Sequence, residues 1–133
     1  MGIKAIARLA PVHIPYTISA GEAADCQIFV ADQDYEIMDV RETHSIAGAS
    51  SSTLDVGVSA SGTAAASLTT ALSSTFALDS TADTPVQATL TSTVANRKVD
   101  KGEQISLNFT GTISAYEGAV HIVLKPIRTN YTY

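Results

Sequence analysis

Histidine is the residue type in this chain best suited to metal binding or to proton transfer near neutral pH. The chain has three: His13, His44 and His121. A zinc site needs three or four nitrogen or sulfur ligands that converge on one point. These histidines lie far apart in the sequence and show no local His-x-His spacing, although folding could still bring them together. We expect surface or strand-face histidines, no metal and no cofactor.

The other reactive residues also lack a catalytic setting. Cys26 follows Asp25 and precedes a short apolar run. A catalytic thiolate is favoured by a nearby cation, so Cys26 is expected to be a small buried apolar residue. Residues 32–34 (DQD) resemble the start of a calcium loop, but Ile37 and Thr43 stand where that loop needs glycine and glutamate. With no nucleophile or phosphate-binding motif, the sequence predicts that the chain is not an enzyme.

Charge and hydropathy limit the partners. The chain has 8 Lys and Arg against 13 Asp and Glu, a net charge of −5. Non-specific nucleic-acid binding requires clustered cations that displace phosphate counterions, so no nucleic-acid partner is expected. No apolar run reaches the roughly 20 residues that span a bilayer, so no membrane partner is expected. A single cysteine excludes a disulfide within the chain.

Strict alternation of apolar and polar residues predicts strands that have one face in a core. The clearest examples are residues 53–60, 104–111 and 119–127. Residues 35–46 form a longer predicted strand, with Met38 and Val40 on one face. The residues predicted to point inward are Leu54, Val56, Val58, Phe76, Leu90, Ile105, Leu107, Phe109, Val120, Ile122 and Leu124.

About eight short strands, with little helical pattern, predict an all-β fold. At this length the expected architecture is an antiparallel β-sandwich of jelly-roll or Greek-key type with extended N- and C-terminal arms. We divide the single domain 1–133 into an N-terminal arm (1–15), the sandwich (16–127) and a C-terminal tail (128–133). Pro11 and Pro15 are expected to hold the N-terminal arm away from its own sheet.

Aromatic residues suggest two kinds of contact. Tyr35 and Tyr116 could form a sugar-binding platform, although a core or rim position is the stronger expectation for both. The terminal segments lie outside the periodic strands yet carry large apolar groups and cations. Such residues suit a protein interface. The candidate partner-binding residues are Ile3, Ile6, Leu9, Arg128, Tyr131 and Tyr133.

The pattern as a whole resembles the small capsid decoration, or cement, proteins of tailed bacteriophages. The resemblance covers about residues 19–127 and includes no catalytic signature. Its most specific part runs from residues 88–91 (ATLT) through 95–99 (ANRKV) to 101–112 (KGEQISLNFTGT). The other matching segments are 19–22 (SAGE), 28–31 (IFVA), 40–48 (VRETHSIAG), 54–58 (LDVGV), 62–72, Phe76, Leu78 and 120–127 (VHIVLKPI).

The resemblance implies a virion structural protein with a jelly-roll-like sandwich. Such a protein is made in the host cytoplasm and binds the outer surface of the capsid, where it stabilises contacts between capsomers. Its implied partners are the major capsid protein and further copies of itself, a homotrimer in preference to a dimer. The alternative is a carbohydrate-binding or adhesin-like β-sandwich module of a phage fibre, which an exposed aromatic platform would favour.

Overall fold

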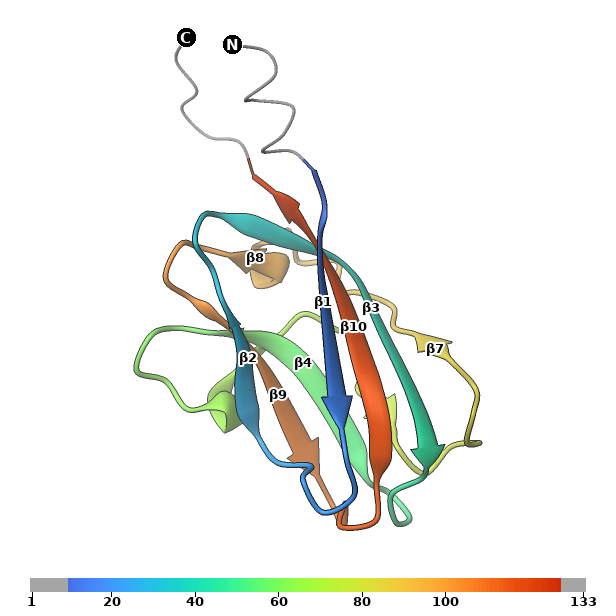
Figure 1. Cartoon of the computed structure of the whole chain (residues 1–133). Helices are drawn as coiled ribbons and strands as arrows, with labels where there is room; N and C mark the ends of the chain where they lie inside the picture. The colour runs from blue at the N-terminus through green and yellow to red at the C-terminus, as the bar shows by residue number, and fades with distance from the viewer. Residues whose placement is uncertain (1–9, 128–133) are drawn as a thin grey trace, which may run out of the picture.

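The computed structural model describes residues 10–127, which form two facing antiparallel β-sheets (Figure 1). Two short 3-10 helices, η1 (Ala65–Ser67) and η2 (Val94–Arg97), interrupt the strands. Within these residues no helix is long and apolar enough to cross a membrane. The strands are β1 (Val12–Ile18), β2 (Cys26–Val30), β3 (Tyr35–Ile46), β4 (Thr53–Ser59), β5 (Thr69–Thr70), β6 (Phe76–Ala77), β7 (Val86–Gln87), β8 (Lys98–Val99), β9 (Gln104–Thr110) and β10 (Glu117–Pro126).

The strand order is that of a jelly roll. One sheet has the order β1-β10-β3-β7, and β8 also pairs with β3. The other has the order β2-β9-β4-β5, and β6 also pairs with β4. Since β5 and β6 share one neighbour, and β7 and β8 share another, the ten strands fill eight positions. The chain changes sheets at each step from β1 to β4, which is the double Greek-key pattern. The predicted all-β sandwich of about eight strands is confirmed.

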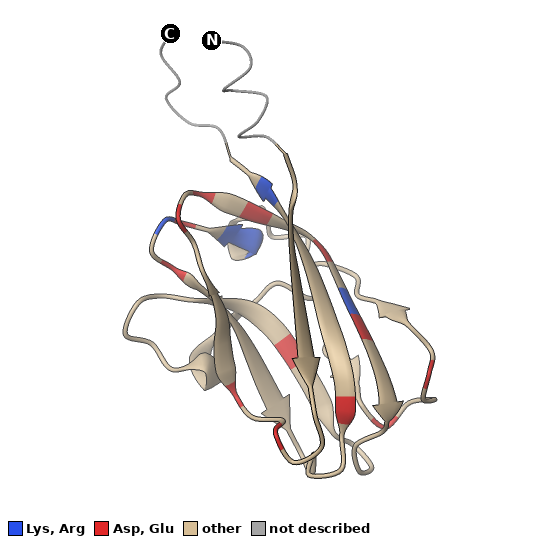
Figure 2. Cartoon of the chain, in the orientation of Figure 1, with Lys and Arg blue, Asp and Glu red and all other residues tan. Residues whose placement is uncertain are grey.

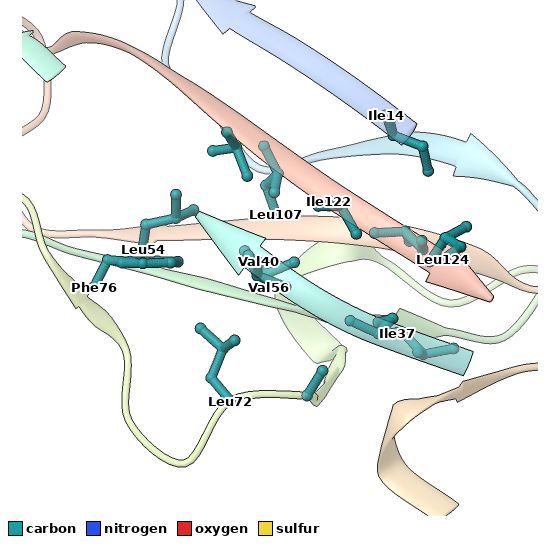
Figure 3. Close-up of a cluster of buried hydrophobic side chains, with 14 of the residues drawn as sticks. Ile14, Ile37, Val40, Leu54, Val56, Leu72, Phe76, Leu107, Ile122 and Leu124 are labelled. Carbon is teal, nitrogen blue, oxygen red and sulfur yellow. The ribbon is translucent and has the colours of Figure 1, made fainter. Parts of the chain in front are cut away.

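The core lies between the two sheets and follows the predicted alternation (Figure 3). Ten of the eleven residues predicted to point inward are buried, and Leu107 and Ile122 have no exposed surface. The exception, Leu90, is half-buried and packs against the edge of the core through its bridge to Leu72. The turn that enters β9 contains Gly102 at φ +89°, a conformation that glycine adopts without strain.

Strand β3 departs from the predicted phase. Its register against β10 shifts between Val123 and Leu124, so that Met38 is an extra residue in β3. This β-bulge turns Ile37 and Val40 to the core although they are three residues apart. The prediction that Met38 shares the buried face with Val40 is therefore wrong, and the Met38 side chain is 46% exposed.

The first strand corrects the predicted N-terminal arm. Residues 12–15 do not stand away from the sheet, because β1 pairs with β10 along its whole length, from Val12 opposite Leu124 to Ile18 opposite Gly118. Pro15 is tolerated because β1 is an edge strand. On the side of β1 that has no neighbouring strand, the N–H that proline lacks is not needed for pairing. The sandwich therefore begins at Val12.

The two outer faces differ in what covers them. On the sheet that contains β9, η1 lies against β2 and β9, and Ser59 and Ser106 are buried with their hydroxyls 2.6 Å apart. The outer face of the other sheet, formed by β1, β10 and β3, carries the exposed side chains of His13, Lys125 and Arg41.

Candidate functional site

The six residues predicted to bind partners lie outside the described residues. Ile3, Ile6 and Leu9 precede them, and Arg128, Tyr131 and Tyr133 follow them. The described chain nevertheless fixes where these segments start. Val12 is paired with Leu124, so the described chain begins and ends at the same end of the sandwich (Figure 1).

A buried polar cluster lies at the other end of the sandwich. Glu42 and His44 lie on the inner face of β3, and Tyr116 immediately precedes β10. Each of the three is at most 1% exposed. His44 Nδ1 donates to Glu42 Oε2 at 2.9 Å, and the Tyr116 hydroxyl donates to the same oxygen at 2.7 Å. The second imidazole nitrogen, Nε2, donates to the backbone carbonyl of Ser80 at 3.0 Å.

The partners of His44 define its charge. Both ring nitrogens face oxygen acceptors, an arrangement that favours the doubly protonated imidazole and its ion pair with Glu42. Burial by itself lowers the pKa of His44. The Ser80 carbonyl and the Glu42 carboxylate outweigh burial, with a smaller contribution from Asp83, and they raise that pKa above its ordinary value of 6.5. Burial, together with the Glu42 carboxylate, also raises the pKa of the Tyr116 hydroxyl, which keeps its proton.

The cluster joins three parts of the chain that are distant in sequence. Besides the Ser80 bond, the backbone N–H of Asp83 donates to the carbonyl of His44 at 2.7 Å, which attaches the loop after β6 to β3. Tyr116 attaches the turn between β9 and β10. Gly118 makes room for it, because a Cβ at this position would overlap the Tyr116 hydroxyl and the Thr43 carbonyl.

A surface depression of about 400 Å³ lies beside this cluster. Its lining includes His44, Asp83 and Glu117. The depression does not form a catalytic site through His44, because both nitrogens of that imidazole are already bonded and offer no lone pair to a substrate. The cluster was not predicted from the sequence. The alternation in β3 could have indicated it, because that alternation places Glu42 and His44 on the same face as Val40.

The other two histidines lie together on the opposite, solvent-facing side of the same sheet. His13 Nδ1 and His121 Nε2 are 3.0 Å apart, with the ring centroids 5.3 Å apart. His13 is opposite Val123, and His121 is opposite Pro15, so the two side chains are diagonal neighbours on β1 and β10. Sequence spacing could not show this contact, because it depends on the pairing of the first and last strands.

The remaining candidates have structural positions. Tyr35 and Tyr116 are 3% and 0% exposed, so neither forms a sugar-binding platform. Cys26 is half-buried, less than predicted, because it lies on the edge strand β2, where its thiol is 3.6 Å from the Tyr16 hydroxyl. Among residues 10–127 no group of three or more His, Cys, Asp and Glu is arranged to hold a metal.

Charged residues are spread over the described surface. Figure 2 shows acidic residues on both sheets and in several turns. Basic residues are fewer and include Arg41, which is bound to Asp39 at 2.7 Å, and Arg97, which is bound to Glu36 at 3.2 Å. The described part of the chain thus offers no broad cationic surface of the kind that a nucleic-acid backbone requires.

Comparison with known proteins gives a match in fold. No protein-family profile matches the chain, and no curated protein matches its sequence. Among solved structures, the fold resembles a chain described as "Capsid of Ralstonia phage GP4", with a TM-score of 0.57 and 13% sequence identity. The match covers 90% of this chain and 84% of that one. At this identity the likeness establishes a shared fold over nearly the whole of both chains.

Proposed function

We propose that this chain is a virion structural protein of a tailed phage that binds the outer surface of the capsid as a decoration, or cement, protein. The observation that carries the proposal is the likeness in fold to a phage capsid structure, which extends over 90% of the chain. The resemblance in sequence pattern points to the same class of protein. The role is one of binding, and it needs no cofactor.

The position of the terminal segments supports a binding role. The described chain begins and ends beside the Val12–Leu124 pair, so both terminal segments are attached at one end of the sandwich. An extended segment can add a strand to the edge of a neighbouring sheet, where its backbone supplies affinity and alternate side chains supply register. We therefore assign the capsid contact to residues 1–10 and 128–133.

The charge of the protein favours the outside of the shell. Packaged DNA presents dense negative charge to the inner surface, which repels a protein of net charge −5. On the outer surface, many bound copies stabilise the shell by mass action, because each copy that binds the assembled state favours that state.

Self-association is part of the proposal, with a trimer preferred to a dimer. A stable interface usually buries about 1,200–2,000 Å² in total, and one small sandwich has little surface area to give to several such interfaces. An oligomer that contacts neighbouring capsomers through separate subunits strengthens weak contacts by raising the effective concentration of each.

Co-sedimentation of the purified chain with capsids assembled in its absence tests the proposal. Saturable binding and a higher melting temperature of the decorated shells are expected. Full-length protein that fails to bind the capsids would refute the proposed function.

Truncations test the assignment of the contact separately. Deletion of residues 1–10 leaves β1 intact, and deletion of residues 129–133 leaves β10 intact, so neither should change the melting temperature of the free sandwich. Each should weaken capsid binding or oligomerisation. Glu22→Gln, an exposed change outside both deletions, is the matched control. Unchanged occupancy and assembly in both truncations would move the contact to the sandwich loops and leave the proposed function standing.

A further inference from the structure

We propose that His13 and His121 form a chelating site for a divalent transition metal of the Ni²⁺ or Cu²⁺ class. This site does not depend on the proposed function. It uses the two histidines that lie outside the buried cluster, and its remaining coordination positions are open to water.

The separation of the two nitrogens fits a shared metal. Metal–imidazole bonds are about 2.0–2.1 Å long, so two nitrogens 3.0 Å apart subtend an angle of about 90–100° at the metal. That angle is near the value for adjacent ligands in octahedral coordination, which Ni²⁺ adopts readily with nitrogen and water. Imidazole nitrogen is also a ligand that these metals bind well, whereas hard cations such as Mg²⁺ and Ca²⁺ bind oxygen ligands.

Metal binding would break the N–H···N bond between the rings, and the donating ring would carry its proton on its other nitrogen, so that both facing nitrogens present a lone pair. The centroid separation of 5.3 Å places the rings nearly end to end, with one nitrogen donating to the other. Binding requires the rings to turn until both lone pairs point to the same side. The position permits this movement, because His13 is exposed and His121 is half-buried on the outer face of the sheet.

The backbone beneath the pair is fixed. His13 lies within the paired part of β1 and His121 within the central strand β10, so the diagonal relation is set by the register of the sheet. Such preorganisation lowers the entropic cost of bringing two ligands together. It also predicts that a bound metal would fasten the edge strand β1 to β10.

The neighbouring charges allow a cation to approach. Arg41 is opposite His121 in the register, but its Nε donates to Asp39 Oδ2 at 2.7 Å, which turns its charge toward its own strand. Lys125 is exposed on the same face and stands opposite Glu36 in the register.

Isothermal titration of the untagged full-length chain with NiCl₂ at pH 8 tests the site. We expect saturable binding of one Ni²⁺ per chain and a rise in melting temperature when Ni²⁺ is present. Loss of an outer-sphere partner alone typically costs about 10–100-fold in metal affinity, so His13→Ala or His121→Ala should remove measurable binding. The matched control is Lys125→Ala on the same face, which should bind Ni²⁺ at least as well as the parent.

A second measurement locates the metal. Paramagnetic Ni²⁺ should broaden the backbone amide signals around residues 13 and 121 and spare those around His44. His13→Ala can be read by itself if His121→Ala fails to fold, because the exposed His13 side chain is not needed for the core. Absence of binding to the parent, binding that survives in the His13→Ala variant, or broadening centred elsewhere would overturn the proposal.

Discussion

Replacement of Glu42 by glutamine tests the buried cluster without changing the volume of the side chain. In the parent, Glu42 Oε2 accepts from both His44 Nδ1 and the Tyr116 hydroxyl. A glutamine amide has one oxygen and a donor group in place of the second oxygen. A glutamine whose oxygen takes the place of Oε2 keeps both bonds, but its NH₂ group then lies where Oε1 stood, 3.3 Å from His44 Nδ1, and the charge of the imidazolium is left without its partner.

The expected cost follows from these contacts. A hydrogen bond to a charged group contributes about 1.5–3 kcal/mol, and removing one member of a buried ion pair costs about 3–5 kcal/mol. Since glutamine keeps one acceptor, we expect Glu42→Gln to lower the free energy of unfolding by about 2–4 kcal/mol. A domain with about 5–15 kcal/mol of stability would remain folded.

The effect has a defined dependence on pH. The pKa of His44 in the folded state lies above its ordinary value of 6.5. The ion pair therefore contributes fully below pH 6.5, where the unfolded chain also binds the proton, and its contribution is lost as pH rises through the raised pKa. The stability difference between parent and Glu42→Gln should be largest near pH 6 and should shrink toward alkaline pH.

Urea unfolding followed by circular dichroism from pH 6 to pH 9 measures this difference. Glu22→Gln, which makes the same chemical change at an exposed carboxylate, should alter stability by less than about 0.5 kcal/mol. If Glu42→Gln behaves like this control, or if its cost is constant across the pH range, the ion pair assigned to Glu42 and His44 does not exist.

Three further substitutions test the fold. Leu107→Asp places an unpaired charge in a fully buried position and should cost several kcal/mol in thermal or urea unfolding; a melting curve like that of the parent would refute the inward assignment of β9. Gly118→Ala forces a Cβ against the Tyr116 hydroxyl and the Thr43 carbonyl, so it should destabilise the chain by about 1–3 kcal/mol, and a neutral result would show that the turn can shift. Met38→Lys should be nearly neutral, within about 0.5 kcal/mol, because the bulge exposes this residue; a large loss would place Met38 in the core.

The sequence predicted the fold class because alternation is a local signal. Strands β4, β9 and β10 keep one phase from end to end, and their large buried apolar residues follow from that phase alone. Strand β3 contains two register shifts against β10, near Met38 and near Ser45. Each shift inserts one residue, and no residue type in the strand marks the position, so alternation alone could not place Met38.

The contacts between distant strands were beyond the reach of local patterns. His13 and His121 meet because the first strand pairs with the last, 108 residues away. Tyr116 reaches Glu42 across 74 residues. The prolines suggested an arm that stands free, but an edge strand tolerates proline, and the apolar alternation of Ile14 and Ile18 agrees with their burial against the core.

The buried cluster explains how β3 holds one register despite its two bulges. A slip by one residue would move every side chain of a strand to the opposite face. In β3 that slip would carry Glu42 away from Tyr116 and His44 away from the Ser80 carbonyl, and it would leave charged or polar groups without partners. An apolar pair at the two positions would tolerate the slip far better, because hydrophobic contact is not directional. We infer that Glu42 and His44 favour the observed pairing of β3 with β10 over pairings shifted by one residue.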